Sequence, residues 1–203
     1  MAMVPQGPEG PGAPELPRTH GAGRVTAARS AAALAGSAVL GLAGGLLWGE
    51  WAPRVLLQEV GTGTAAYVNV ESRAFFGGDV WFGGIAVVAG LLTGILGYRF
   101  ALGRREGAGR AAVAAALILG AVAGSLVMLW LGTRIGLAGY NHQLASSPVG
   151  TRFSQYLALG SKSALALWPL CTSAVLLIAE WSTRPAPERF QPGQPAPPEH
   201  PAA

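Results

Sequence analysis

Charged residues are scarce in this chain. Asp, Glu, Lys and Arg make up 12% of its 203 residues, whereas soluble domains average about 25%. Hydrophobic residues make up 51%, and the mean hydropathy is positive. The composition therefore excludes an ordinary soluble domain and is typical of a membrane protein. The net charge of +4 is spread too thinly for a nucleic-acid-binding surface, so no nucleic-acid partner is expected.

Cysteine is nearly absent. The single cysteine, Cys171, has no partner for a disulfide within the chain, and it falls inside an apolar run. A cysteine in apolar surroundings is inert and behaves as a small hydrophobic residue. We therefore assign Cys171 to packing and not to chemistry.

Ionisable residues are also missing from the interior of the apolar runs. Ion-coupled carriers and proton relays depend on such residues within the membrane, so their absence argues against a coupled transporter. No catalytic motif replaces them, because His142 stands near Ser146 and Ser147 without a GxSxG or HExxH context. The sequence accordingly predicts no enzyme, no cofactor and no metal ligand set.

Four apolar runs are present, each long enough to cross a bilayer as a helix, which takes about 20 residues. They cover residues 30–51, 80–101, 111–133 and 159–181, within a membrane domain of residues 24–184. The first run is too long for the core of a secretory signal, so we expect it to be retained. Residues 1–23 and 185–203 are rich in Pro, Gly and Glu, and we expect disordered tails there, because such segments bury too little apolar surface to offset the entropy of ordering.

Aromatic and basic residues suggest how these runs sit in a membrane. Trp48 and Trp51 flank Glu50 at the end of the first run, as in an interfacial aromatic belt, and Pro53 follows. Glu50 is therefore interpreted as a boundary marker. Nine of the 14 Lys and Arg residues lie in the two tails and the short second loop. The positive-inside rule then predicts a multi-pass cell-membrane protein with both termini cytoplasmic, and anionic lipid headgroups would attract the arginine-rich loop.

Small residues recur at a spacing of four along three of the runs. In lipid, helices associate through close contact at such residues. We expect these three helices to pack against one another, with a homo-oligomer through one ridge as the alternative. The fourth run has no glycine, which predicts a peripheral helix, kinked at Pro169. The predicted packing positions are Gly41, Gly45, Gly49, Ala86, Gly90, Gly94, Ala116, Gly120 and Gly124.

The two longer loops fall on the outer side. In the first, residues 56–60 and 66–70 alternate apolar and polar residues around Gly-Thr-Gly, which predicts a small β-hairpin, with an irregular loop as the alternative. Glu59, Glu71 and Asp79 form an acidic set in or beside this loop, which would suit a cation or a cationic envelope component. Capping is the simpler alternative, with Ser72 or Asp79 at the start of the second helix.

Four short motifs stand out along the chain. They are WAPR at the close of the first run, ESRAFFGGDVWF leading into the second, RFALGRREG after it, and WPL in the last. Together they resemble a family of small actinobacterial membrane proteins of unknown function, over residues 25–182. The resemblance implies a multi-pass cell-membrane protein with a four-helix bundle, and it carries no activity, cofactor or catalytic residue.

These observations predict an all-α membrane fold: a four-helix transmembrane bundle with a small outer β-hairpin or loop between the first two helices. The function they favour is a non-enzymatic scaffold or accessory subunit of the cell envelope, with an unidentified protein partner. The alternative is a small uncoupled transporter or channel component. That alternative needs a polar pore lining, for which the runs offer only Ser37, Thr93, Ser125, Thr172 and Ser173.

Overall fold

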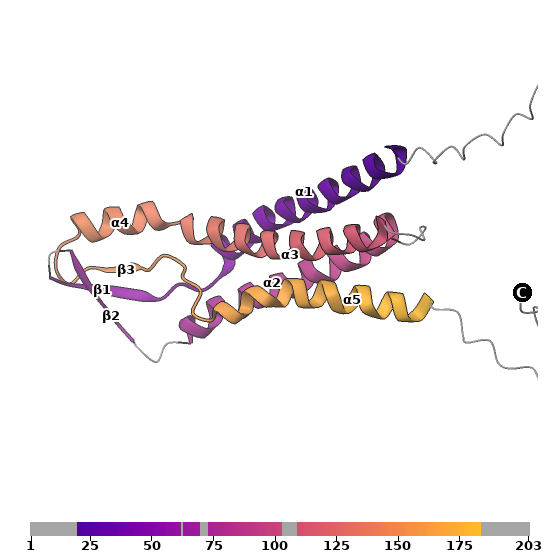
Figure 1. Cartoon of the computed structure of the whole chain (residues 1–203). Helices are drawn as coiled ribbons and strands as arrows, with labels where there is room; N and C mark the ends of the chain where they lie inside the picture. The colour runs from indigo at the N-terminus through magenta and orange to yellow at the C-terminus, as the bar shows by residue number, and fades with distance from the viewer. Residues whose placement is uncertain (1–19, 62, 70–72, 103–108, 184–203) are drawn as a thin grey trace, which may run out of the picture.

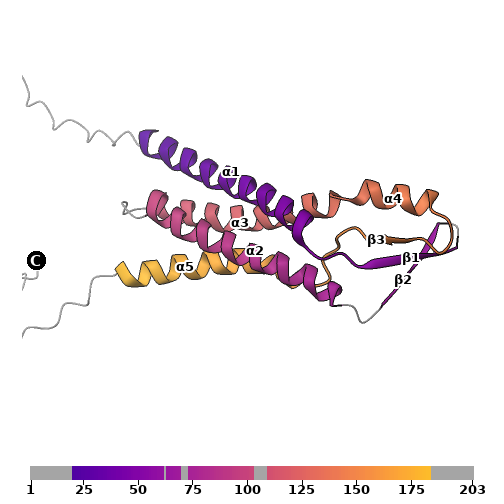
Figure 2. The same ribbon diagram turned by 180° about the vertical axis from the view of Figure 1, so that it is seen from behind.

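The computed structural model describes residues 20–61, 63–69, 73–102 and 109–183. Four long helices run side by side, and a small sheet with a short helix extends beyond one end of them, which we call the sheet end (Figure 1). At the opposite end, α1 begins and α5 finishes (Figure 2). We call this the terminal end of the bundle.

The four long helices account for the four predicted spans. They are α1 (His20–Trp51), α2 (Ala74–Gly97), α3 (Gly109–Arg134) and α5 (Leu167–Thr183). A π-helical turn, η1 (Tyr98–Leu102), continues α2, and a 3-10 turn, η2 (Lys162–Ala166), leads into α5. With these turns, each helix is long and apolar enough to cross a membrane, which confirms the prediction of four such helices. Helices are favoured because lipid offers no water to backbone N–H and C=O groups.

Three helices start at places that the sequence did not predict. α1 begins at His20 rather than near residue 30, so residues 20–23 are helical and do not belong to a disordered tail. α2 begins at Ala74 rather than near residue 80, so Asp79 lies in its second turn and does not cap it. Its N-cap residue is Arg73, which makes no capping hydrogen bond through its side chain. α5 begins at Leu167, which puts Pro169 in the first turn instead of at a kink. A proline is tolerated there because first-turn N–H groups have no partner within the helix.

Helices α1 and α3 form the most extensive contact of the bundle. A Cβ atom added to Gly41 would lie 2.5 Å from the carbonyl oxygen of Gly124. One added to Gly45 would lie 2.9 Å from the carbonyl oxygen of Met128. The ridge of small residues on α1 therefore faces α3, and the two backbones are in direct contact.

Helices α2 and α5 form the second close pair. A Cβ atom added to Gly90 would lie 2.7 Å from the carbonyl oxygen of Trp168, and one added to Gly94 would lie 2.7 Å from the Cβ of Val175. The small-residue ridge of α2 thus faces α5 and not α1. The prediction of a peripheral α5 is wrong, because α5 supplies the large side chains that cover the glycines of α2.

Large side chains fill the centre of the bundle. Four of them, one from each helix, are 0% exposed: Trp48, Phe82, Met128 and Trp168. The rings of Trp48 and Phe82 meet edge to face, with centroids 5.2 Å apart. The indole N–H of Trp48 donates to the carbonyl oxygen of Gly78 at 2.8 Å, and that of Trp168 donates to Oγ1 of Thr93 at 3.1 Å. Trp48 is therefore a core residue and not the interfacial one that the sequence suggests.

Three short strands form an antiparallel sheet in the order β2-β1-β3. β1 (Leu56–Gly61) and β2 (Thr64–Tyr67) make the predicted hairpin, with Gly63 at a φ of +71° in the turn. β3 (Arg152–Ser154) comes from the other long loop and was not predicted. The short helix α4 (Leu137–Ser146) lies between α3 and β3 in the chain. The two long loops are thereby joined into one unit, the sheet-end unit (β1–β3 and α4).

Candidate functional site

Glu59, the first residue of the predicted acidic set, is buried in β1 with 1% of its surface exposed. Its Oε1 accepts a hydrogen bond from the backbone N–H of Gly63 at 2.9 Å. Its Oε2 has no hydrogen-bond partner among the described residues. The carboxyl group therefore stabilises the hairpin turn from inside and is withdrawn from solvent.

Asp79 acts as a link between α2 and the segment that precedes η2. Its two carboxylate oxygens accept hydrogen bonds from the backbone N–H groups of Gly160 and Ser161, both at 2.9 Å. Such charge-assisted bonds are stronger than bonds between neutral groups. Asp79 thus fixes where the chain enters its last span, and it belongs to a different local network from Glu59.

The third member of the acidic set, Glu71, lies outside the described residues. Within the described part of the chain, no group of three or more His, Cys, Asp or Glu residues is arranged to hold a metal ion. An outer acidic site for a cation or a cationic partner stays a prediction.

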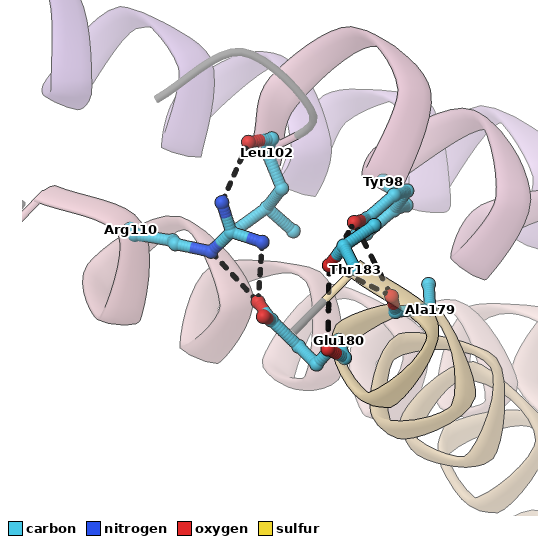
Figure 3. Close-up of polar contacts among 6 residues, drawn as sticks. All are labelled: Tyr98, Leu102, Arg110, Ala179, Glu180 and Thr183. Atoms are coloured by element: carbon cyan, nitrogen blue, oxygen red, sulfur yellow. Dashed lines mark hydrogen bonds and ion pairs between the residues drawn. The ribbon is translucent and has the colours of Figure 1, made fainter. Parts of the chain in front are cut away.

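A polar cluster at the terminal end was not predicted (Figure 3). Arg110 donates through Nε to Oε1 of Glu180 at 2.7 Å, and a second nitrogen of the same guanidinium lies 2.6 Å from that oxygen. Nη1 of Arg110 donates to the carbonyl oxygen of Leu102 at 3.1 Å. The hydroxyl of Tyr98 donates to Oγ1 of Thr183 at 3.1 Å. Together these bonds link α2, α3 and α5 at one end of the bundle.

The polar cluster holds helix ends together at the terminal end of the bundle. The side chains of Arg110 and Glu180 are 25% and 41% exposed, so the pair is partly solvated. Arg110 also caps the end of η1, where Leu102 presents a free carbonyl group. The sequence does contain a signal for this pair. Arg110 and Glu180 have opposite charges, and each lies within about one turn of the predicted cytoplasmic end of its apolar run. In the sequence, Arg110 counts only toward the orientation of the helices, and Glu180 is not predicted to pair with it.

An apolar groove of about 550 Å³ runs between α1 and α2. These two helices have far less contact with each other than either has with its close partner. Small residues form part of the groove wall, and a Cβ atom added to Gly84 would meet nothing within 4 Å. The walls include Leu40, Gly44, Leu47, Trp81, Gly84 and Val88. In a membrane this surface faces lipid.

A polar pocket of about 430 Å³ lies in the sheet-end unit, between α4 and β3. Arg54 and Arg152 are among the residues that line it, and none of its lining residues is acidic. Nη2 of Arg54 also donates to the carbonyl oxygen of Gly49 at 2.6 Å, close to the end of α1. The other lining residues are Gly136, Gly139, Tyr140, Gln143, Phe153, Ser154 and Gln155. We call this the two-arginine pocket, and the sequence analysis does not predict it.

The remaining polar candidates, His142, Ser146 and Ser147, lie in or beside α4. The hydroxyl of Ser146 donates to the backbone carbonyl of His142 at 2.7 Å, one helical turn back, and not to its imidazole ring. Ser147 is the C-cap of α4. Glu50 is exposed at the sheet end of α1, as expected of a boundary residue.

Comparison of the chain with protein-family models, with curated proteins and with solved structures finds no match. The resemblance seen in the short motifs therefore stays an interpretation of those motifs. The candidate function rests on the geometry of the bundle and of the sheet-end unit.

Proposed function

We propose that this chain is a non-enzymatic accessory or scaffold subunit of a cell membrane, which presents the sheet-end unit on the outer side. The observation that carries the proposal is that two loops far apart in sequence fold into one body. Leu57 of the first loop pairs with Phe153 of the second, and the backbone N–H of Glu59 donates to the carbonyl of Thr151 at 2.9 Å. A unit built in this way offers a preformed surface, which lowers the entropic cost of binding a partner.

Apolar side chains on this unit support a protein partner. Leu56 and Val60 of β1 are 52% and 56% exposed, and Val149, in the turn before β3, is 65% exposed. These residues lie in the sheet-end unit, which extends beyond the end of the helices (Figure 1), where lipid does not account for apolar exposure. Exposed apolar groups on such a surface are typical of a protein-binding site.

The bundle interior favours this proposal over an uncoupled transporter or channel within one chain. Its centre is filled by aromatic and Met side chains. Three of the five hydroxyls that a pore could use are bonded inside the bundle: those of Thr93 and Ser125 donate to carbonyl groups one turn back, and that of Thr172 donates to the carbonyl of Gly90. Polar groups that are satisfied in this way do not offer a hydrated path.

Site-specific photo-crosslinking in intact cells tests the proposal. A photoreactive residue replaces Val60 or Val149 in the sheet-end unit, and Leu177, which is 70% exposed on α5, serves as the matched control in the bundle. We expect one adduct of defined mass from each sheet-end position and none from Leu177. Adducts only at twice the mass of the chain, together with a symmetric oligomer in mild detergent, would support the pore instead.

The orientation is tested by thiol labelling. Cys171 is replaced by Ser, and single cysteines are introduced at Val149 in the sheet-end unit or at Ser182 at the terminal end. We expect a membrane-impermeant maleimide to label the cysteine at 149 in intact cells and the one at 182 only after permeabilisation. The reverse pattern would place both termini outside and contradict the orientation.

A further inference from the structure

The two-arginine pocket has a charge that nothing in its wall balances. Arg54 and Arg152 both line the same cavity of about 430 Å³, and its lining includes no Asp or Glu. Neither arginine is in an ion pair among the described residues, where the ion pair found is that of Arg110 and Glu180. Both side chains are exposed, so a solute can reach them. Two positive charges beside one cavity attract an anion into it.

The start of α4 adds a second feature that favours an anion. Gly136, the N-cap residue, has a φ of +84° and makes no side-chain capping bond, so the first N–H groups of this ten-residue helix are left uncapped. Gly136 and Gly139 both line the pocket, which places bare backbone at its wall. Uncapped N–H groups and the helix dipole together favour a negative charge at a helix N-terminus.

Neutral polar side chains complete the lining. Gln143, Gln155 and Tyr140 also line the cavity. The Tyr140 ring is held in place by Phe153 and Tyr156, with centroids 5.8 Å and 5.2 Å away. These groups can donate hydrogen bonds to oxygen atoms beyond those that the arginines reach.

We propose that the two-arginine pocket binds a phosphate-bearing group of the size of a lipid headgroup. A guanidinium binds phosphate oxygens through two parallel N–H bonds, which makes arginine well suited to this ligand. The volume falls within the usual range of small-molecule sites, about 300–1,000 Å³, and exceeds that of a bare anion.

The position of the pocket is compatible with two sources of the phosphate group, a lipid headgroup and a soluble phosphate ester. Arg54 is three residues beyond Trp51, the last residue of α1, and Gly136 is two residues beyond Arg134, the last of α3. The pocket is therefore next to the ends of two membrane helices, within reach of the headgroups of the adjoining leaflet. The same chemistry would bind a soluble phosphate ester from the sheet side.

The test uses the purified full chain in nanodiscs, without any partner protein. In one arm the nanodisc is phosphatidylcholine, and glycerol phosphate is titrated by calorimetry. In the other, phosphatidylglycerol is mixed into the phosphatidylcholine, and the lipid retained by the protein is measured by native mass spectrometry. Saturable binding in the first arm identifies a soluble ester, and preferential retention of phosphatidylglycerol in the second identifies a headgroup. Binding in neither arm overturns the proposal.

Arg152→Gln is the decisive variant. The guanidinium of Arg152 makes no hydrogen bond or ion pair with any described residue, so its loss should leave the fold intact. We expect about tenfold weaker binding, as for the loss of one charged hydrogen-bonding group. Arg73→Gln, an exposed arginine at the same end of the bundle but outside the pocket, is the matched control and should bind as wild type. An equal loss of affinity in Arg152→Gln and Arg73→Gln would mean that the phosphate group is attracted non-specifically to the protein surface, and it would overturn the proposal. A wild-type affinity in Arg152→Gln would likewise overturn the proposal, and neither result bears on the accessory role.

Discussion

The close contact between α1 and α3 predicts that two glycine-to-alanine substitutions on α1 will differ in their effect on stability. The Cβ atom of Gly41→Ala would lie 2.5 Å from the carbonyl oxygen of Gly124 and 3.1 Å from its Cα. Because both atoms belong to the backbone, the helices themselves must move apart. Gly36→Ala is the matched control, since a Cβ at Gly36 meets nothing within 4 Å.

Gly41→Ala and Gly36→Ala differ only in the contact between the added Cβ atom and the backbone of α3. Both gain roughly 0.5–1 kcal/mol of helix stability, since alanine restricts the unfolded chain more than glycine does. At Gly41, separating the backbones by about 0.5–1 Å loses a quarter to a half of the dispersion energy of each atom pair at the crossing. Overpacking of this kind costs about 1–3 kcal/mol. We therefore expect Gly41→Ala to be less stable than Gly36→Ala by about 1–3 kcal/mol.

The assay is unfolding of the purified protein in mixed micelles as the fraction of dodecyl sulfate rises, followed by tryptophan fluorescence and circular dichroism. A further variant, Gly124→Ala, tests the same crossing from α3, because the added Cβ would lie 2.9 Å from the carbonyl oxygen of Ser37 on α1. It would also lie 2.7 Å from the Trp168 ring of α5, so part of its cost arises outside this crossing. The double variant Gly41→Ala with Gly124→Ala should cost less than the sum of the two, because the first methyl group already opens the contact. Equal midpoints for Gly41→Ala and Gly36→Ala would refute direct backbone contact between these helices.

Three further predictions concern polar contacts. Trp168→Phe removes the bond to Thr93 and should lower the free energy of unfolding by about 1 kcal/mol, whereas Trp168→Ala also leaves a cavity and should cost about 3–5 kcal/mol in the same assay. Asp79→Asn weakens two charge-assisted bonds, and we expect faster amide exchange at the two N–H groups before η2 with little change in the bundle. Glu180→Gln breaks the ion pair with Arg110; because both groups are partly solvated, we expect a loss below about 1 kcal/mol that shrinks as salt is added.

The helices were predictable because their signal is local. A run of about 20 apolar residues without charge has one stable form in lipid, whatever its neighbours are. The hairpin was predictable for a similar reason, since two alternating segments flank a glycine-containing turn. Boundaries were less predictable. The start of α2 at Ala74 and the placement of Pro169 in the first turn of α5 depend on contacts beyond those segments.

The pairing of helices was not predictable from ridges of small residues alone. A ridge of small residues predicts that another helix packs closely against it, but it does not identify that helix. The ridge on α2 meets Trp168 and Val175 of α5, a helix without glycine, because close packing needs a large group opposite a small one as readily as two small ones. The same reasoning applies to Trp48, which has the sequence context of an interfacial residue but is buried, because its ring packs directly over Gly132 of α3.

Sequence by itself determined that this chain has four apolar helical runs without charges in their interior, since composition and run length act within each segment. Tertiary structure decided everything that joins distant segments: the strand β3 added to the hairpin, Asp79 bonded to the entry of the last span, and the Arg110–Glu180 pair. It also decided that Arg54 and Arg152 share one pocket, although 98 residues separate them in the chain. Such neighbours arise from packing between elements, and no periodicity within a single element encodes them.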